Sequence, residues 1–293
     1  MRTVETFAVI GGDLRSAYLA GALAADGCRV ITSGFDGTEL PACVTACTNP
    51  TQAIALADCV ILPLPVSSDG VNVNAPFSRV PIPLESVVQA AREDQLLLGG
   101  QIGDSLRRDL ALRGLSVADY FSREELAVLN AVPTAEGAIQ LAMEELPITL
   151  AGSRCLVTGY GRVARVLVRL LCAMDVEVHV AARRCSDRAW AQAQGCVPLE
   201  LSAMTRQRYD VIFNTVPHKL FSREVLEQLD KGTLLIDLAS RPGGVDFNAA
   251  AELRLKTIWA LSLPGRVAPK SAGIIIKQTV MNMIKEDAVW GSK

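Results

Sequence analysis

The fold is decided by the stretch Arg154-Cys155-Leu156-Val157-Thr158-Gly159-Tyr160-Gly161-Arg162-Val163-Ala164, which continues into an apolar helical pattern over residues 166–171. An apolar run that ends in Gly-x-Gly-x-x-Ala is typical of a buried parallel strand turning into a helix. In such a turn the first glycine permits the tight bend, and the second lets the main chain approach a pyrophosphate. The small third residue lets the helix pack closely on the strand. The free N–H groups of the helix N-terminus then attract the anion.

This pattern predicts a dinucleotide site, because a strand, a helix and a second strand at residues 177–181 follow one another in the required order. The alternative is an ordinary strand-to-helix turn of the same fold that holds no ligand. The residues that would contact the dinucleotide through this turn are Gly159, Tyr160, Gly161, Arg162 and Val163.

The end of the second strand indicates which dinucleotide binds. In this fold an acid about 20 residues beyond the glycines holds the ribose 2′-hydroxyl of NAD. Here Arg183, Arg184 and Ser186 stand in that region, and guanidinium groups pair with phosphate through a bidentate fork. The sequence therefore predicts NADP rather than NAD, the alternative being a solvated arginine pair. Thr215 and Pro217, after a further apolar strand, are expected to flank the same cofactor.

The two halves of the chain follow the same plan. The run Val9-Ile10-Gly11-Gly12 resembles the start of the glycine turn above, and later apolar runs match at similar offsets. Alternating strands and helices indicate parallel sheets covered on both faces. We therefore expect an α/β protein with two tandem doubly wound, Rossmann-like domains and a cleft between them. Residues 1–130 would form the substrate and catalytic domain, and residues 131–293 the NADP-binding domain. The expected helices include one at Leu14–Ala25, a hinge helix at about 133–144 and a closing helix at about 271–287.

Composition excludes several classes of function. The chain has 293 residues, half of them hydrophobic, and a net charge of −2, so it has no basic field for nucleic acid or an anionic membrane. The segment before the first apolar run, residues 1–5, is too short for a signal peptide and contains Glu5. No apolar run approaches the roughly 20 residues that span a bilayer. Eight scattered cysteines and two histidines favour reduced thiols over a metal site. We therefore expect a cytoplasmic protein without a metal.

Candidate catalytic residues follow the predicted strands and the hinge. Arg241 ends one strand, and Arg266 and Lys270 follow the last one, so these cations could bind a carboxylated substrate or could be ordinary surface charges. The acid–base and hydroxyl candidates are Asp13, after the first glycine turn, and Thr134 and Glu136, in the hinge helix.

The two histidines and Glu136 have structural alternatives. Glu136 is equally suited to starting a helix without any chemistry. His218, beside Pro217, could shuttle a proton, whereas His179 lies inside a predicted strand and is interpreted as structural.

Five stretches together resemble the A-subunit family of dipicolinate synthase, and the resemblance covers nearly the whole chain. They are Ala8-Val9-Ile10-Gly11-Gly12-Asp13, Asn130-Ala131-Val132-Pro133-Thr134-Ala135-Glu136-Gly137, Gly159-Tyr160-Gly161-Arg162, Asp237-Leu238-Ala239-Ser240-Arg241-Pro242-Gly243-Gly244 and Leu263-Pro264-Gly265-Arg266-Val267-Ala268-Pro269-Lys270.

The resemblance implies an oxidoreductase of sporulating bacteria that acts in the mother-cell cytoplasm. It would convert a dihydrodipicolinate-type product of the lysine and diaminopimelate pathway into dipicolinate. Its implied partner is a smaller, flavoprotein-like B subunit. A homo-oligomer is expected as well.

Two other functions remain open from the sequence. The chain could be an NAD(P)-dependent dehydrogenase of a 2-hydroxy or 2-amino acid, since the fold alone does not exclude it. It could also be a binding subunit that is inactive without the B subunit. A dinucleotide-sensing regulator would need an interaction module, which the sequence does not reveal.

Overall fold

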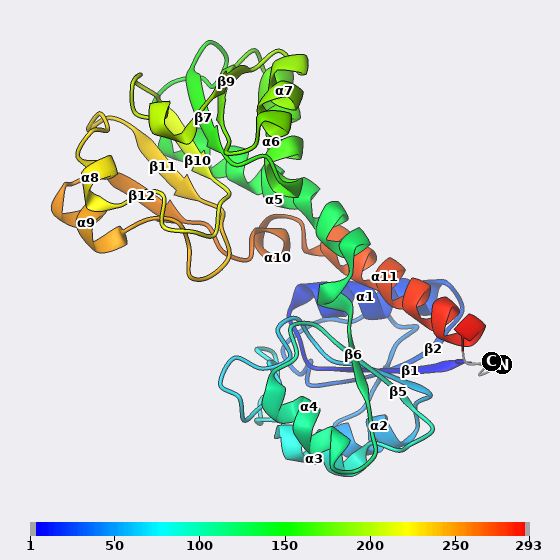
Figure 1. The fold of residues 1–293 in the computed structure, drawn as a ribbon. Coiled ribbons are helices and arrows are strands. Elements are labelled where there is room, and N and C mark those ends of the chain that lie inside the picture. Colours follow the sequence, from blue (N-terminus) through cyan, green and yellow to red (C-terminus); the bar gives the residue numbers. More distant parts are fainter. Residues whose placement is uncertain (1–3, 291–293) are drawn as a thin grey trace. The chain divides into compact units, whose positions relative to one another are not determined.

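The computed structural model describes residues 4–290, with side chains described for residues 4–286. Its contacts divide the chain into two compact units (Figure 1). The first contains the chain up to Leu129 and again from Ala268 onward, and the second contains Asn130–Val267. Each unit has one six-stranded sheet in which every neighbouring pair of strands is parallel. The predicted fold class, two tandem doubly wound parallel-sheet domains, is confirmed.

The sheet of the first unit has the strand order β3-β2-β1-β4-β5-β6, the order of a dinucleotide-binding fold. Its strands are β1 (Thr6–Ile10), β2 (Arg29–Ser33), β3 (Thr45–Ala46), β4 (Cys59–Ile61), β5 (Leu96–Gly99) and β6 (Val117–Asp119). One face is covered by α1 (Leu14–Ala25) and α11 (Pro269–Trp290). The other is covered by α2 (Pro50–Ala55), α3 (Leu84–Ala90) and α4 (Asp104–Ala111), and a short 3₁₀ helix, η1 (Tyr120–Ser122), follows β6.

The second unit repeats this topology as β12-β11-β10-β7-β8-β9. Its strands are β7 (Arg154–Thr158), β8 (Glu177–Ala181), β9 (Val197–Leu199), β10 (Val211–Asn214), β11 (Leu234–Asp237) and β12 (Lys256–Trp259). One face packs against α5 (Glu124–Glu145), α6 (Arg162–Ala173), α7 (Cys185–Ala193) and α10 (Leu263–Val267). The other packs against η2 (Leu201–Ala203), α8 (Arg223–Leu226) and α9 (Phe247–Glu252). Because both faces are covered, the central strands are buried along nearly their whole length, which is why they consist of unbroken apolar runs.

The helix expected at 133–144 begins earlier than predicted. α5 starts at Glu124, has Glu124 and Glu125 in its first turn, and contains Pro133 in its interior. Pro133 has no N–H to donate to the carbonyl four residues earlier. The neighbouring Thr134 hydroxyl donates to the Asn130 carbonyl at 2.7 Å. The sequence prediction treated Pro133 as a helix start, whereas here the proline is accommodated one turn after the division between the units.

The closing helix also differs from its prediction. α11 begins at Pro269, and the chain from Ala268 belongs to the first unit rather than to the dinucleotide-binding half. Gly273 permits this packing, because a Cβ there would lie 2.4 Å from the Arg15 carbonyl oxygen on α1. Ile276 and Val280 of the same helix are buried in the first unit's core.

α5 is long and apolar enough to cross a membrane, which the sequence was not expected to offer, and it is the only such helix of residues 4–290. In the most apolar 18-residue stretch of this helix, 44% is already buried inside the protein. Ala135, Ala138 and Ala142 of this helix pack in the core of the second unit.

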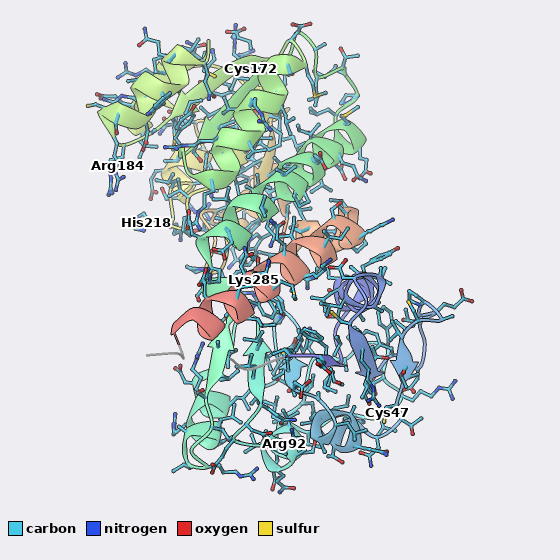
Figure 2. All side chains as sticks on the ribbon, turned by 90° about the vertical axis from the view of Figure 1, so that its right-hand side faces the viewer. Cys47, Arg92, Cys172, Arg184, His218 and Lys285 are labelled. Carbon is cyan, nitrogen blue, oxygen red and sulfur yellow. The ribbon has the colours of Figure 1, made fainter. Side chains whose placement is uncertain are left out.

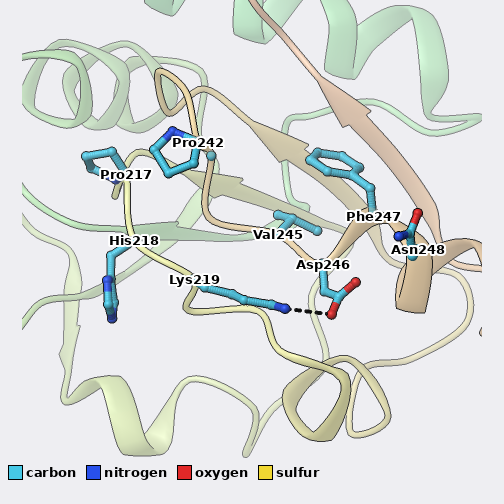
Figure 3. Close-up of a pocket in the computed structure, with 9 residues that line it drawn as sticks. Pro217, His218, Lys219, Pro242, Val245, Asp246, Phe247 and Asn248 are labelled. Atoms are coloured by element: carbon cyan, nitrogen blue, oxygen red, sulfur yellow. Dashed lines mark ion pairs between the residues drawn. The ribbon is translucent and has the colours of Figure 1, made fainter.

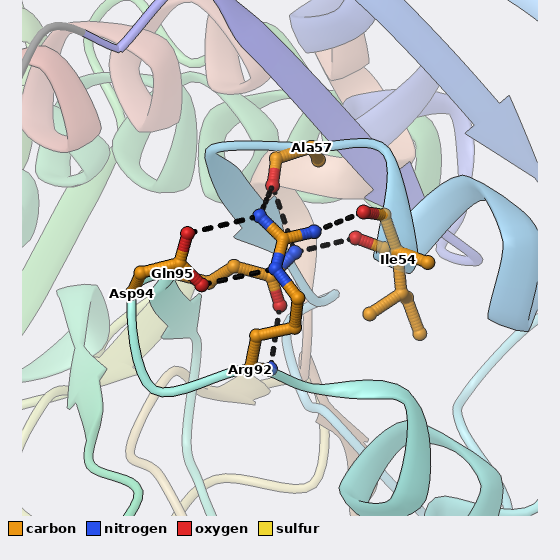
Figure 4. Close-up of polar contacts among 6 residues, drawn as sticks. Ile54, Ala57, Arg92, Asp94 and Gln95 are labelled. Atoms are coloured by element: carbon orange, nitrogen blue, oxygen red, sulfur yellow. Dashed lines mark hydrogen bonds and ion pairs between the residues drawn. The ribbon is translucent and has the colours of Figure 1, made fainter.

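The C-terminal end of α2 is capped by side chains from the loop before β5 (Figure 4). Gln95 is only 5% exposed, and its amide nitrogen donates to the carbonyls of Ile54 at 2.6 Å and Ala57 at 2.7 Å. Arg92 donates to the Ala55 carbonyl and is paired with Asp94. These contacts add donors to carbonyls at and just beyond the end of the helix, of which that of Ile54 also accepts from the Ala57 N–H.

Substituting Gln95 with alanine is expected to destabilise the protein by about 2 kcal/mol, because two carbonyls lose a buried donor. The matched control is Gln89→Ala, since Gln89 is exposed and donates only to Glu85 within one helix turn. Urea denaturation of both variants measures the difference in unfolding free energy. Equal stability of the two variants would contradict this capping role.

Candidate functional site

The glycine turn of the second unit has the geometry predicted from the sequence. Gly159 has φ +86°, and its N–H donates to the Ala181 carbonyl at 2.9 Å. A Cβ at Gly159 would lie 2.7 Å from the Thr215 hydroxyl oxygen and 2.8 Å from Val216. Only glycine fits both the backbone conformation and the space.

The second glycine faces open space at the N-terminus of α6. A Cβ at Gly161 would meet no atom within 4 Å, and no side chain caps this helix end. Ala164, one turn into the helix, is completely buried, which allows α6 to pack closely on β7. A helix N-terminus with open space beside it fits a dinucleotide diphosphate. Val163 is half-buried and Arg162 is exposed in the same first turn.

The equivalent turn in the first unit is closed by the chain's own loop. The Gly12 N–H donates to the Asn74 carbonyl at 2.8 Å, and a Cβ at Gly11 would lie 2.9 Å from the Cβ of Ala75. Both contacts come from the long segment 67–83. A phosphate has no free approach to this turn, so the open turn of the second unit is the better dinucleotide site.

Asp13 is held by a neighbour that sequence reasoning missed. Its carboxylate caps α1 by accepting from the Arg15 N–H at 2.9 Å, and it pairs with the Arg15 guanidinium at 2.8 Å. The same guanidinium donates to the Leu64 carbonyl at 2.6 Å. The Asp-x-Arg spacing at the start of a helix was the available signal. Arg15 therefore fixes the position of this acid–base candidate.

Tyr160 contributes only its main chain to the turn. Its side chain is 5% exposed, the Arg165 guanidinium lies 5.5 Å from the centre of its ring, and its buried hydroxyl has no hydrogen-bond partner. Burial raises the pKa of this hydroxyl. The side chain therefore does not face a ligand at the surface.

The three polar residues predicted to select NADP lie together at the carboxyl end of β8. Arg183, Arg184 and Ser186 follow this strand directly, and the two arginines are exposed; Arg184 extends outward from the protein (Figure 2). Arg188 donates to the main-chain carbonyls of Ala182 at 2.9 Å and Arg183 at 3.1 Å, which fixes the turn that carries them. The two predicted guanidinium groups thus lie beside the position where the ribose binds in this fold.

The loop after β10 lies between the glycine turn and a cavity. Thr215 donates its hydroxyl to the Thr158 carbonyl at 2.8 Å, so this side chain fixes the turn. Pro217 and His218 line a cavity of about 510 Å³ together with Pro242 of the next loop (Figure 3). His218 is exposed there.

An ion pair joins the two loops at that cavity. Lys219 and Asp246 approach to 2.8 Å, and the hydrogen bond from Lys219 holds the pKa of Asp246 below its usual value. This pair therefore ties the loop after β10 to the start of α9.

Arg241 lies in the loop after β11. It is exposed, and its guanidinium carbon lies 5.8 Å from the centre of the Trp259 ring. The Trp259 indole N–H donates to the Ala239 carbonyl at 3.1 Å. The tryptophan therefore supports both this loop and the cation that it presents.

The remaining candidates are distributed over both units. Arg266 lies on α10 in the second unit, whereas Lys270 is exposed on α11 in the first. Glu136 is exposed in the interior of α5, so its alternative interpretation as a helix-start residue is wrong. His179 is 2% exposed in β8 and contacts Glu177 and Tyr209, as expected of a structural residue.

Sequence reasoning also missed two buried polar residues, Asn214 and Asp237. Each ends an apolar strand, and each is completely buried. A polar residue at the end of an otherwise apolar run was the available signal, but the partner of each lies in another strand.

Two family models match separate halves of the chain. Residues 6–121 match the N-terminal domain of the dipicolinate synthase A subunit. Residues 129–257 match the NAD-binding domain of D-isomer specific 2-hydroxyacid dehydrogenases. The second unit is therefore a dehydrogenase-type NAD-binding domain, in agreement with the open glycine turn.

Comparison with individual proteins covers nearly the whole chain. The chain is 30% identical to the dipicolinate synthase A subunit of Bacillus subtilis strain 168, over 98% of both chains. The crystal structure of the A subunit from Bacillus halodurans matches with a TM-score of 0.88 and 28% identity, over 97% of this chain and 98% of that one. The crystal structure of the Bacillus subtilis protein matches with a TM-score of 0.86 and 28% identity, over 99% and 98%. The chain belongs to the A-subunit family of dipicolinate synthase.

Proposed function

We propose that this chain is the NADP-dependent A subunit of a dipicolinate synthase. It would oxidise a dihydrodipicolinate-type ring dicarboxylate to dipicolinate, in the mother-cell cytoplasm of a sporulating bacterium. The observation that carries the proposal is the contrast between the two glycine turns. One is closed by the protein's own loop, and the other has open space at a helix N-terminus without a side-chain cap. Family membership supplies the substrate class.

In the proposed reaction the chain binds the two carboxylates of the substrate. Arg241, with Lys270 or Arg266, is suited to the two anionic groups, because a guanidinium pairs with a carboxylate through two parallel hydrogen bonds. The bound nicotinamide coenzyme supplies the hydride acceptor. The ring loses one hydride and one proton, so a base is needed for the proton.

The candidate bases are Glu136, Asp13 and a bound water, and Thr134 is a hydroxyl candidate in the same helix as Glu136. Asp13 is held in place by the Arg15 guanidinium, so its carboxylate keeps one orientation. Since the product is aromatic, the intrinsic driving force is large. The protein then contributes chiefly by positioning the reactants and by electrostatic stabilisation.

A second candidate function is oxidation of a 2-hydroxy or 2-amino acid. The match of residues 129–257 to the 2-hydroxyacid dehydrogenase domain favours it, as does an exposed arginine in the loop after β11. A third candidate is a subunit that binds coenzyme but turns over only with a smaller, flavoprotein-like B subunit. We also propose a homo-oligomer for the active form.

Spectrophotometric measurement of NADPH formation separates these functions. The chain is assayed with a dihydrodipicolinate-type substrate, with 2-hydroxy acids and with 2-amino acids, each in the presence and absence of the B subunit. We expect turnover of the ring dicarboxylate but not of the 2-hydroxy or 2-amino acids. Turnover of a simple hydroxy or amino acid, but not of the ring compound, would contradict the proposal. Activity that requires the B subunit would identify the third candidate.

The predicted NADP preference is tested by replacing both Arg183 and Arg184 with alanine. Loss of the phosphate-binding guanidinium groups is expected to weaken NADP binding about 10- to 100-fold and to leave NAD binding unchanged. The control is Arg206→Ala with Arg208→Ala, which removes the same charge from exposed residues that precede β10, at the amino ends of the strands. Equal weakening of NADP binding in both double variants would mean that only net charge matters.

A further inference from the structure

Three buried polar residues form a row across the carboxyl end of the second sheet. Thr158 on β7 is paired in register with Asn214 on β10, and Asn214 is paired with Asp237 on β11. All three are completely buried. These strands lead directly into the glycine turn, the loop of Thr215–Pro217 and the loop that carries Arg241.

Hydrogen bonds connect the three side chains of this row. The Thr158 hydroxyl donates to Asn214 Oδ1 at 2.6 Å, and Asn214 Nδ2 donates to Asp237 Oδ1 at 2.7 Å. Asn214 Oδ1 also accepts from the Val216 N–H at 3.2 Å, and its Nδ2 donates to the Val216 carbonyl at 3.1 Å. The carboxamide is thereby held in one orientation, with its nitrogen toward the carboxylate.

The Asp237 carboxylate holds both ends of the loop that presents Arg241. Oδ1 accepts from the Ala239 N–H at 3.0 Å, and Oδ2 accepts from the Gly244 N–H at 2.8 Å. Gly244 allows the close approach, because a Cβ there would lie 2.2 Å from Asn214 Nδ2. Arg241 lies between these two fixed points.

Burying a carboxylate this deeply costs folding free energy, because the charged group loses its hydration. An apolar residue of similar size would avoid this loss. It is retained here with amide donors on both oxygens, and two of these donors bracket the Arg241 loop. Trp259 supports the same loop through its indole N–H and the Arg241 guanidinium. A buried acceptor and an external aromatic ring thus restrict where the guanidinium can lie.

We propose that Asp237 is a positioning residue for Arg241: its carboxylate fixes the loop so that the guanidinium meets a substrate carboxylate without reorganisation. This inference rests on the proposed function, which gives Arg241 its anionic ligand. Asn214 supports this role because its Nδ2 donates to Asp237 Oδ1 and so helps to hold the carboxylate in place. Neither residue touches the substrate.

The test is a double-mutant cycle measured as dipicolinate affinity. Isothermal titration calorimetry with dipicolinate is carried out on the chain saturated with NADP, for wild type, Asp237→Asn, Arg241→Ala and the double variant. Asparagine at 237 keeps the shape of the side chain but loses one acceptor oxygen. We expect Asp237→Asn to weaken dipicolinate binding about tenfold in wild type and to have no further effect when Arg241 is absent.

The control is Asp210→Asn, because Asp210 accepts from the Arg154 N–H at the opposite end of the same sheet. Its dipicolinate affinity is expected to match wild type. Asn214→Ala removes the Nδ2 donor to Asp237 Oδ1 without adding any atom, and it should reproduce the dependence on Arg241 if Asp237→Asn fails to fold.

The outcomes separate this inference from the proposed function. Equal weakening by Asp237→Asn with and without Arg241, or no weakening at all, would overturn the positioning role and leave the function of the chain intact. Unchanged dipicolinate binding by Arg241→Ala would overturn the positioning role and also the substrate-binding role of Arg241 in the proposed function, because the guanidinium would then have no anionic ligand.

Discussion

Substitution of Gly161 with valine is expected to weaken NADP binding at least about 100-fold while the chain folds normally. Gly161 has an ordinary φ of −81°, and an added Cβ meets no protein atom within 4 Å. The new side chain therefore causes no strain in the free protein. It would instead fill the space in which a pyrophosphate approaches the N-terminal amides of α6.

Gly103 provides the matched control for this prediction. It is also the N-cap of a helix, α4, with φ −69°, open space where a Cβ would lie and no side-chain cap. Gly103→Val should therefore cost the same small amount of helix stability and leave NADP binding unchanged. Calorimetric titration and thermal unfolding of both variants give the comparison. Wild-type affinity in Gly161→Val would show that the diphosphate binds elsewhere.

Substitution of Arg241 with alanine is expected to lower kcat/KM for the ring dicarboxylate about 100-fold, chiefly through KM. The guanidinium is exposed in the loop after β11, and the paired hydrogen bonds that it would form with a substrate carboxylate are charge-assisted. Arg241→Lys should recover only part of the loss, because an ammonium keeps the charge but lacks the planar fork. Coenzyme affinity should stay unchanged in both variants.

Arg169→Ala is the control for this second prediction, since Arg169 is exposed on α6. Steady-state kinetics of the three variants with the same substrate measure the effect. Full activity of Arg241→Ala would remove the main substrate-binding residue from the proposed site. A similar loss in Arg169→Ala would indicate a general charge effect.

The fold was largely predictable because its signals are local. Strands of a covered parallel sheet are buried on both faces, so β7 and β8 appear as short apolar runs. The bounds of α1 were predicted as Leu14–Ala25, because an apolar strand runs into the helix and Gly27 follows its end. In the structure Asp13 caps the start of this helix, and Gly27 has φ +89°. The glycine turn at Gly159 is local in the same sense.

Features that depend on distant contacts were predicted poorly. Pro133 signals a helix start, but α5 extends back to Glu124, and Leu126 in this extension is buried in the core of the first unit. The closing helix was assigned to the wrong half, because its packing partner α1 lies near the other end of the chain. Sequence patterns carry no information about such partners.

In the candidate site, too, local features were predictable from the sequence and contacts between distant segments were not. The glycine turn and the arginines after β8 were identified from spacing alone. The hydrogen bonds from Asn214 to Thr158 and Asp237 were missed, because they form only once β10 lies between β7 and β11. The closure of the first glycine turn by Asn74 was missed for a similar reason.

Isothermal titration calorimetry of the wild-type chain with NADP tests the central claim most directly. One open glycine turn per chain predicts saturation at one NADP per chain and weaker binding of NAD. Absence of heat with either coenzyme, from a chain that is folded by circular dichroism, would contradict it.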